Sequence, residues 1–281
     1  MNYYPITPKT TVDTLVDLWL RQLRAEERLE GSTIDEYERV LRKLVVPRIG
    51  GARLNELTMN QINMVLAELG TESLNFQRKA KVVTGAMLDT AVELGALTVN
   101  PVRGSLSISR PEPEHRSLTA SELETVRIAV RVWLSKERSG PRSSPDIADI
   151  IEMMVATGAR IGEVLALRWA DIDLSMRVVE INATIKTESG VGTYRKPLAR
   201  PRLIALPESA AMLLDSRRRS VPDNFLDAMF PTRNLTWQQV NNVERRWRQI
   251  RREAGLEWVT TEAFRRSSPD GGPSRDCLPE P

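Results

Sequence analysis

The stretch Ala156–Trp169, which runs Ala-Thr-Gly-Ala-Arg-Ile-Gly-Glu-Val-Leu-Ala-Leu-Arg-Trp, decides the fold of this chain. It places Arg160 just after a glycine turn, at the start of an apolar-periodic helix that leads into Asp171-Ile172-Asp173. A helix N-terminus is the positive end of the helix dipole, so a cation there is unfavourable unless an anion such as a phosphate binds beside it. The alternative is an ion pair between Arg160 and Glu163 at helical spacing, which contributes only about 0.2–0.5 kcal/mol. The residues alone leave both interpretations open.

Composition excludes several classes of protein. The 281 residues are enough for two domains, each with its own core, and 41% hydrophobic with 27% charged residues is an ordinary balance. No apolar run is long enough to cross a bilayer and no signal peptide is visible, so we expect a cytoplasmic protein. The single cysteine, Cys277, and single histidine, His115, exclude an internal disulfide and leave a metal site poorly supplied. We therefore expect neither a metal nor a cofactor.

The basic residues concentrate in the second part of the chain. The net charge of +3 is too small to indicate nucleic-acid binding by itself. Residues 1–100 hold 12 basic and 13 acidic side chains, and residues 101–281 hold 28 and 24. Guanidinium groups suit two-point contact with phosphate, although a solvated helical face explains the clusters equally well. The clustered arginines are Arg217, Arg218, Arg219, Arg245, Arg246, Arg248, Arg251 and Arg252.

Helical periodicity fills the region before residue 100. Apolar spacing and cap residues predict four helices, starting near Val12, Ser32, Thr58 and Ser73, with Pro47 and Gly50-Gly51 expected to end the second. Four such helices with short loops predict a compact bundle. We divide the chain into this bundle (residues 1–100), a Ser- and Pro-rich linker (101–117), a second domain (118–266) and a tail (267–281).

The second domain is expected to be mainly helical with a small antiparallel sheet. Thr119 and Glu122 form a capping-box pattern, and a further helix is expected over 147–155. Apolar residues then alternate with polar ones over 178–182 and again over 202–207, which predicts strands, with glycines 190 and 192 at a turn between them. Helices are expected to resume over 207–219 and 236–254, with Gly255 as C-cap residue.

This order of elements resembles the tyrosine recombinases, or phage-type integrases, over nearly the whole chain. The segment Ala156–Asp173 is similar to the motif around the family's first arginine, and the bundle is similar to its four-helix core-binding (SAM-like) domain. The resemblance implies a mainly α fold, with the bundle followed by an incomplete catalytic domain. It also implies a chain encoded by a prokaryote or a phage.

The resemblance also implies a chemistry. In the family a tyrosine attacks a DNA phosphodiester and forms a 3′-phosphotyrosine, two arginines clamp the phosphate oxygens, and a lysine protonates the leaving oxygen. Carried onto this sequence, Arg160 is the first arginine and Glu163 supports its turn. Lys196 matches the lysine, with Lys186 as the competing choice. No metal and no nucleotide cofactor is needed.

The match weakens after residue 260. Arg265 takes the position of the second arginine, but Glu262 stands where the family usually has histidine, and a carboxylate repels a phosphate. The family then has further helices, a Gly-His motif and the nucleophilic tyrosine. Here residues 267–281 have no apolar period, and we expect a disordered tail from a shifted reading frame or an early stop. None of the four tyrosines (Tyr3, Tyr4, Tyr37 and Tyr194) occupies the nucleophile's position.

Three functional hypotheses follow. The first is a DNA-binding member of the recombinase family, made for site-specific recombination and phage-type integration but unable to cleave DNA alone. The others are a non-enzymatic DNA-binding remnant and an inert, unstable fragment. The expected partner is double-stranded DNA, with other recombinase subunits as a further possibility, and neither a membrane nor a small-molecule cofactor. Besides Arg160, Lys196 and Arg265, the candidate DNA contacts are Arg42, Lys43, Gln77, Arg78, Lys79, Lys81 and Arg245.

Overall fold

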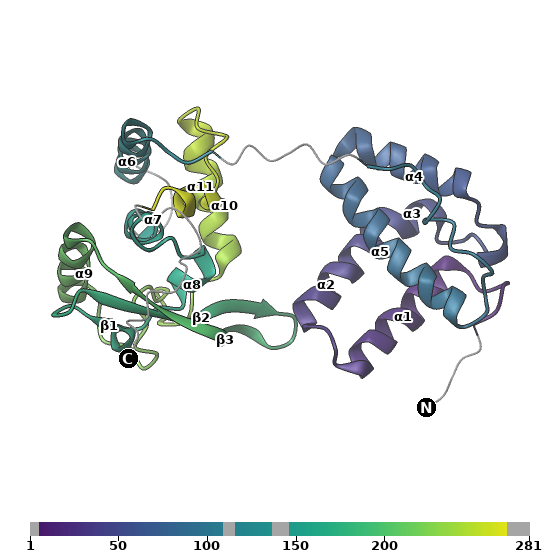
Figure 1. Cartoon of the computed structure of the whole chain (residues 1–281), viewed down its shortest axis with the longest axis horizontal. Coiled ribbons are helices and arrows are strands. Elements are labelled where there is room, and N and C mark those ends of the chain that lie inside the picture. The colour runs from purple at the N-terminus through teal and green to yellow at the C-terminus, as the bar shows by residue number, and fades with distance from the viewer. Residues whose placement is uncertain (1–5, 109–115, 137–145, 269–281) are drawn as a thin grey trace, which may run out of the picture. The chain divides into compact units, whose positions relative to one another are not determined.

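A computed structural model describes residues 6–108, 116–136 and 146–268, and Figure 1 shows the whole chain. These residues divide into two compact units, one formed chiefly by the part of the chain before residue 113 and one by the part after it. Each unit encloses its own cluster of buried apolar side chains, the first with Leu15 and Met87 and the second with Ile150 and Phe230 at its centre. None of the described helices is both long and apolar enough to cross a membrane.

The first unit is a helical bundle. Helix α5 packs along α4 and also contacts α1 and α2 (Figure 1). Side-chain caps fix two of the predicted starts, because Thr11 and Thr58 each accept a hydrogen bond from the backbone N–H three residues on. The helical elements are α1 (Val12–Glu26), α2 (Gly31–Val40), the π-helical turn η1 (Leu41–Val45), α3 (Val46–Ile49), the 3₁₀ turn η2 (Leu54–Glu56), α4 (Met59–Glu72) and α5 (Leu74–Glu93).

The prediction that Pro47 and Gly50-Gly51 end the second helix is wrong for Pro47, whereas Gly50 is the C-cap residue after Ile49. The helical backbone runs through Pro47 to Ile49 because the turn before it, Leu41–Val45, widens to a π turn in which the Val46 N–H bonds to the Leu41 carbonyl. Proline lacks an N–H and its ring clashes with the carbonyl four residues back in a regular α-helix. The wider turn removes that conflict, and Pro47 then occupies the first turn of α3, where its missing N–H costs nothing.

Residues 100–106 pack on the bundle, although the sequence places residues 101–117 in a linker. The Asn100 side chain donates to the Gly85 carbonyl (2.8 Å) and Val102 is buried in the first core. The Leu106 N–H bonds to the Asn63 side chain at 2.9 Å. The ordered first unit therefore extends to about residue 106, while residues 109–115 lie outside the described part of the chain.

The second unit combines helices with one small sheet. The predicted capping box of Thr119 and Glu122 forms at the start of α6, with the Thr119 N–H bonding to the Glu122 carboxylate at 2.9 Å. The elements are α6 (Ala120–Ser135), α7 (Asp146–Thr157), α8 (Ile161–Leu165), the 3₁₀ turn η3 (Trp169–Asp171), β1 (Ile172–Asp173), β2 (Val178–Glu188), β3 (Gly192–Ala205), α9 (Glu208–Ser220), α10 (Val240–Glu253) and α11 (Thr261–Arg266).

The sheet is more extensive than predicted. Its strand order is β1-β2-β3, and β2 and β3 form a long hairpin joined by residues 189–191 (Figure 1). The sequence indicated a strand only from residue 202 because Pro197 and Pro201 interrupt the run before it. Proline cannot donate to a sheet ladder, but β3 is an edge strand, and both prolines are exposed there.

The final long helix starts later than predicted. Helix α10 begins at Val240 rather than at Thr236. Trp237 is instead buried and paired with Pro231 in a short bridge, and the side chain of Gln238 enters the interior. Gly255 follows the helix with a positive φ of 67°, as its predicted role at the C-terminus requires.

Candidate functional site

Arg160 lies at the N-cap of α8, as the opening stretch predicts. Its backbone is extended (φ −69°, ψ 150°), and its N–H donates to the Glu163 carboxylate at 3.0 Å to complete a capping box. The Glu163 side chain is only 4% exposed, whereas the Arg160 side chain is 64% exposed. The guanidinium lies 3.5 Å from the Glu163 carboxylate, a loose ion pair. The turn is therefore held by the backbone of Arg160, which leaves its side chain largely open to solvent.

Arg202 is the stronger partner of Glu163. Its Nη2 donates to the same carboxylate oxygen, Oε2, that accepts from the Arg160 N–H, at 2.7 Å. Burial opposes ionisation of Glu163, but the hydrogen bonds from Arg202 and the Arg160 N–H outweigh it and lower the pKa of this carboxyl. The sequence analysis missed this contact because 39 residues separate the two side chains and no spacing pattern relates them.

Arg265 meets the same turn from α11. Its Nε donates to the carbonyl oxygen of Gly158 at 3.1 Å, two residues before Arg160. Gly158 has a φ of +61°, and a Cβ there would lie 3.5 Å from the Arg265 carbonyl oxygen. The glycine thus lets the chain turn between α7 and α8 and lets α11 approach closely. The two arginines that the resemblance pairs come together around this turn.

Glu262 would compete with an incoming anion for the Arg265 guanidinium. Its carboxylate accepts from Arg265 Nη1 at 3.0 Å and lies 3.8 Å from Arg266 Nη2. Both contacts have the i,i+3 and i,i+4 spacing of neighbours on a helix surface. An anion that approached Arg265 would have to displace a carboxylate that is 44% exposed.

Lys196 lies half-buried on β3, in the hairpin that β2 and β3 form. Its competitor, Lys186, lies half-buried on β2 across the hairpin turn, and neither lysine is without an interaction. The adjacent Arg195 fixes this part of β3, because its Nε donates to the Ala166 carbonyl at the end of α8 (2.9 Å) and its Nη2 pairs with Asp171 (3.0 Å). The strand that carries Lys196 is thereby attached to both α8 and η3.

Gly162 lets the sheet approach the start of α8. A Cβ at this position would lie 2.7 Å from Thr184 Oγ1 on β2 and 3.5 Å from Val240 at the start of α10. A contact under about 3 Å forces a neighbour to move. The glycine therefore lets α8, β2 and α10 approach one another two residues after Arg160.

Several bundle candidates for DNA contact are already engaged. Arg42 donates to Asp13 (2.7 Å) and to Asp17, both on α1. Lys79 pairs with Glu36 on α2. Lys81 donates to the carbonyl oxygens of residues 105 and 106, at 3.3 and 2.6 Å. These three side chains tie helices and the 100–106 segment together, a structural role that the periodicity alone does not indicate.

The remaining candidates differ in exposure. Lys43 is exposed on η1, Gln77 packs over Gly70, and Arg78 is half-buried and has interactions of its own. In the second unit Arg245 is exposed on α10, where it contacts Asn242 at 3.3 Å. Val240, the first residue of α10 and five residues before Arg245, lies against Gly162.

One member of the arginine clusters, Arg217, is an interior residue, and another, Arg246, is half-buried. Arg217 is 5% exposed and donates to Asp146 (2.7 Å), Asp149 (2.6 Å) and the Met229 carbonyl (3.0 Å). Gln238 continues the network from Asp146 to Arg246, and burial lowers the pKa of Arg246. The interpretation of Arg217 as part of an exposed basic cluster is wrong, because its guanidinium group neutralises carboxylates inside the second unit.

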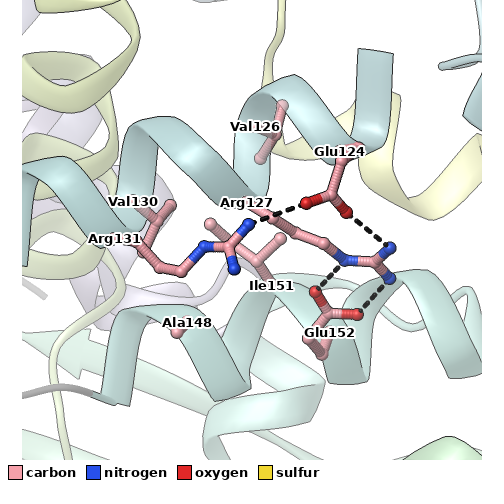
Figure 2. Close-up of a pocket in the computed structure, with 8 residues that line it drawn as sticks. All are labelled: Glu124, Val126, Arg127, Val130, Arg131, Ala148, Ile151 and Glu152. Atoms are coloured by element: carbon pink, nitrogen blue, oxygen red, sulfur yellow. Dashed lines mark hydrogen bonds and ion pairs between the residues drawn. The ribbon is translucent and has the colours of Figure 1, made fainter. Parts of the chain in front are cut away.

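A groove between α6 and α7 is a separate feature of the second unit. It has a volume of about 240 Å³, an apolar floor that includes Val130 and Ile151, and a charged rim (Figure 2). Arg127 forms a two-point contact with Glu152 at 2.7 and 2.8 Å, and Glu124 links Arg127 to Arg131. Because the rim charges neutralise one another, the groove is a weaker candidate for binding a charged ligand than the Arg160 turn. Across the described ranges no group of three or more His, Cys, Asp or Glu side chains could hold a metal ion.

The described tyrosines differ in their surroundings. Tyr37 belongs to the first unit, where its ring stacks on Trp19 at a centroid distance of 5.7 Å. Tyr194 is half-buried on β3, and Tyr3 and Tyr4 lie outside the described residues. Of the expected tail, Ser267 bonds to the Leu118 N–H at 2.7 Å and Ser268 is buried, while residues 269–281 are outside the described part.

Comparison with known proteins agrees with this architecture. Residues 117–268 match the phage integrase family. The integrases of Mycobacterium phages FRAT1 and D29 are each 24% identical over 208 residues, which is 72% of this chain and 57% and 51% of theirs. The chain therefore spans about half the length of these curated relatives.

Solved structures show the same fold. The Tn1549 transposon integrase (residues 82–397), solved in complex with circular intermediate DNA, superimposes with a TM-score of 0.72 at 18% identity, covering 92% of this chain and 85% of that one. A lambda integrase dimer bound to a COC' core site gives a TM-score of 0.68 at 18% identity, covering 93% and 70%. The fold defined by these features is that of a two-unit recombinase. The chain belongs to the phage integrase family, the tyrosine recombinases.

Proposed function

We propose that this chain binds double-stranded DNA through its phosphate backbone, using the Arg160 turn as the centre of the contact, and that it does not cleave DNA by itself. The observation that carries the proposal is the meeting of Arg160 and Arg265 at the Gly158 turn. Two guanidinium groups at one turn form a suitable site for a phosphate, because each can make charge-assisted, two-point hydrogen bonds to the phosphate oxygens.

Further residues support the DNA contact. Arg245 is exposed on α10, whose first residue packs against Gly162 beside Arg160. Lys196 lies on a strand attached to α8 and would supply a proton or a further phosphate contact, as the family resemblance implies. Lys43 is the best placed of the bundle candidates, since it is exposed. The relatives named above that were solved with DNA make the same partner class the first choice here.

The binding test uses the full chain and a duplex labelled for fluorescence anisotropy. Salt dependence reports phosphate contacts, since each one contributes about 0.9 to the slope of log K against log salt. The double variant Arg160→Ala/Arg265→Ala is expected to bind more weakly at low salt and to lower the slope by about two.

A charge-matched control separates a local contact from net charge. Arg131 and Arg219 are also in the second unit and have side chains that are 68% and 72% exposed. The variant Arg131→Ala/Arg219→Ala should leave the slope within experimental error of the unmodified chain. Equal losses in both double variants would overturn the proposal that the Arg160 turn is the binding centre.

The absence of cleavage is a separate expectation. In the family the nucleophile follows the second arginine, and no tyrosine follows Arg265 in this sequence. Incubation with a nicked duplex that traps 3′-phosphotyrosine should give no covalent adduct in a denaturing gel. An adduct that disappears in Tyr194→Phe, or in a Tyr3→Phe/Tyr4→Phe variant, would contradict this expectation and identify the nucleophile.

The closed core of the second unit favours a binding protein over the alternative of an inert fragment. Val259, Ala263 and Phe264 are buried at the end of the described chain, and Trp247 Nε1 donates to the Val259 carbonyl at 2.8 Å. A cooperative thermal transition for the purified chain supports the binding hypothesis, whereas concentration-dependent aggregation at low temperature supports the inert fragment.

A further inference from the structure

We propose that Arg202 is a positioning residue that neutralises the buried Glu163 carboxylate, so that the Arg160 guanidinium is left free for a phosphate. The inference rests on the proposed function, because it explains how the anion-binding side chain is kept available. It concerns a residue that touches Glu163 and that is assigned no contact with DNA.

The geometry of the carboxylate carries the argument. Glu163 Oε2 accepts both the Arg160 N–H (3.0 Å) and Arg202 Nη2 (2.7 Å), while Oε1 lies 3.5 Å from Arg160 Nη1. The short charged contact is therefore with Arg202, and the long one is with Arg160. A carboxylate that is 4% exposed needs a close cation, since ionisation in the interior is otherwise costly.

Without Arg202, Arg160 would be the cation that compensates the buried Glu163 carboxylate. The Arg160 side chain is 64% exposed and is within reach of Oε1, so it is the other guanidinium that can compensate Glu163. An arginine that turns inward to satisfy a buried carboxylate is lost to an external anion. Arg202 is 33% exposed and its donor is already committed to Glu163, which fits a supporting role.

The same contact joins the two parts of the site. Arg202 belongs to β3, six residues after Lys196, and Glu163 belongs to α8, three residues after Arg160. Among the described residues, the charged groups that act on the Glu163 carboxylate are Arg202 from β3 and Arg160 from its own helix start. From the other packed elements, Thr184 of β2 and Val240 of α10 lie at Gly162. One ion pair thus sets both the charge of the turn and its distance from the strand.

The test uses Arg202→Met, which keeps an unbranched apolar stem and removes the charged guanidinium group. Duplex binding at pH 7.5 is expected to be about tenfold weaker than for the unmodified chain, the loss expected for one charge-assisted contact. Affinity should recover as the pH is lowered towards 5, because the pKa of Glu163 rises without Arg202 and protonation releases Arg160. The unmodified chain should lack this pH-dependent recovery. Far-UV circular dichroism at each pH checks that the variant is folded.

Two further variants separate positioning from direct contact. Glu163→Gln/Arg202→Met removes both charges and is expected to restore affinity to within about twofold and to remove the pH dependence. Arg202→Lys keeps the charge and should retain most of the affinity. If Arg202→Met binds weakly and Glu163→Gln/Arg202→Met binds equally weakly, Arg202 contacts DNA itself. If Arg202→Met binds as tightly as the unmodified chain, Arg160 does not depend on Arg202. Either result overturns the inference.

Arg160→Ala distinguishes this inference from the proposed function. If Arg160→Ala binds DNA as well as the unmodified chain does, the proposed function fails. If Arg160→Ala binds weakly while Arg202→Met binds normally, the inference alone fails. If the proposed function and the inference about Arg202 are both correct, Arg160→Ala/Arg202→Met should bind DNA no more weakly than Arg160→Ala, since Arg202 acts through Arg160.

Discussion

Replacement of Arg217 by alanine is expected to lower the free energy of unfolding of the second unit by about 3–5 kcal/mol, the cost of leaving a buried ion pair without one partner. Arg217 is almost fully buried and donates to two carboxylates and one carbonyl, and its guanidinium lies 4.2 Å from the Phe230 ring centroid. The variant leaves Asp146, itself 8% exposed, with less of its charge compensated. The network joins α9, α7 and the start of α10, so its loss affects all three.

The measurement is urea unfolding of the full chain, followed by tryptophan fluorescence and analysed as two transitions, because two units need not unfold together. Arg219→Ala is the matched control, since Arg219 is 72% exposed and pairs with Asp215 one turn away. Its expected cost is no more than about 0.5 kcal/mol. Arg217→Lys should remain destabilised, because an ammonium cannot make the same forked contacts. Equal effects of Arg217→Ala and Arg219→Ala would contradict the assignment of Arg217 to the interior.

The loss of stability in Arg217→Ala is expected to depend on pH, and the direction of this dependence follows from the Asp149 carboxyl. Burial raises the pKa of Asp149, and the hydrogen bond and charge of Arg217 work against that rise. Without Arg217 the pKa of Asp149 rises further, so the folded variant holds a proton at a pH where the unfolded chain does not. The stability deficit of Arg217→Ala is therefore expected to be largest near neutral pH and to shrink as the Asp149 carboxyl is protonated in acid.

Local signals in the sequence predicted much of the fold. Helix starts marked by Thr58 and Thr119 are where the capping boxes form, and Gly158 and Gly255 adopt the positive φ that a turn after a helix requires. These features depend on residues three or four positions apart. The same is true of the Arg160 turn, whose Glu163 cap lies one helical turn away.

Features that depend on distant residues could not be predicted in this way. The continuation of helix through Pro47 depends on a π turn, and the length of β3 depends on its place at the sheet edge. The separation of Arg217 from its exposed neighbours depends on carboxylates about 70 residues away. An arginine in a basic run resembles an exposed charge until its partners are known, and this explains why the sequence did not indicate that Arg217 is buried.

The second large loss of stability is expected when Phe264 is replaced by alanine. This side chain is fully buried and packs edge-on against Trp247, with ring centroids 4.9 Å apart. Phe264→Ala is expected to cost about 3–5 kcal/mol, the usual range for loss of a buried aromatic ring. The measurement is the urea transition of the second unit, and Phe264→Leu should lose no more than about 1.5 kcal/mol because it keeps most of the volume.

The functional consequence should exceed the loss of stability. Helix α11 has only six residues, and a helix this short depends on tertiary packing for its stability. Phe264 supplies that packing next to Arg265, whose Nε bond to the Gly158 carbonyl brings the two arginines of the proposed phosphate site together. Release of α11 should therefore weaken DNA binding at least as much as Arg265→Ala does, even where the rest of the second unit remains folded.

Hydrogen exchange distinguishes this local effect from global unfolding. In Phe264→Ala the amides of α11 should exchange faster under conditions in which those of α7 and α10 stay protected. Phe264→Leu should bind DNA almost as tightly as the unmodified chain. A Phe264→Ala protein that loses the expected stability and exchange protection but binds DNA normally would show that Arg265 is not part of the contact. Normal protection of α11 together with weak binding would instead point to a role of the Phe264 ring that packing does not explain.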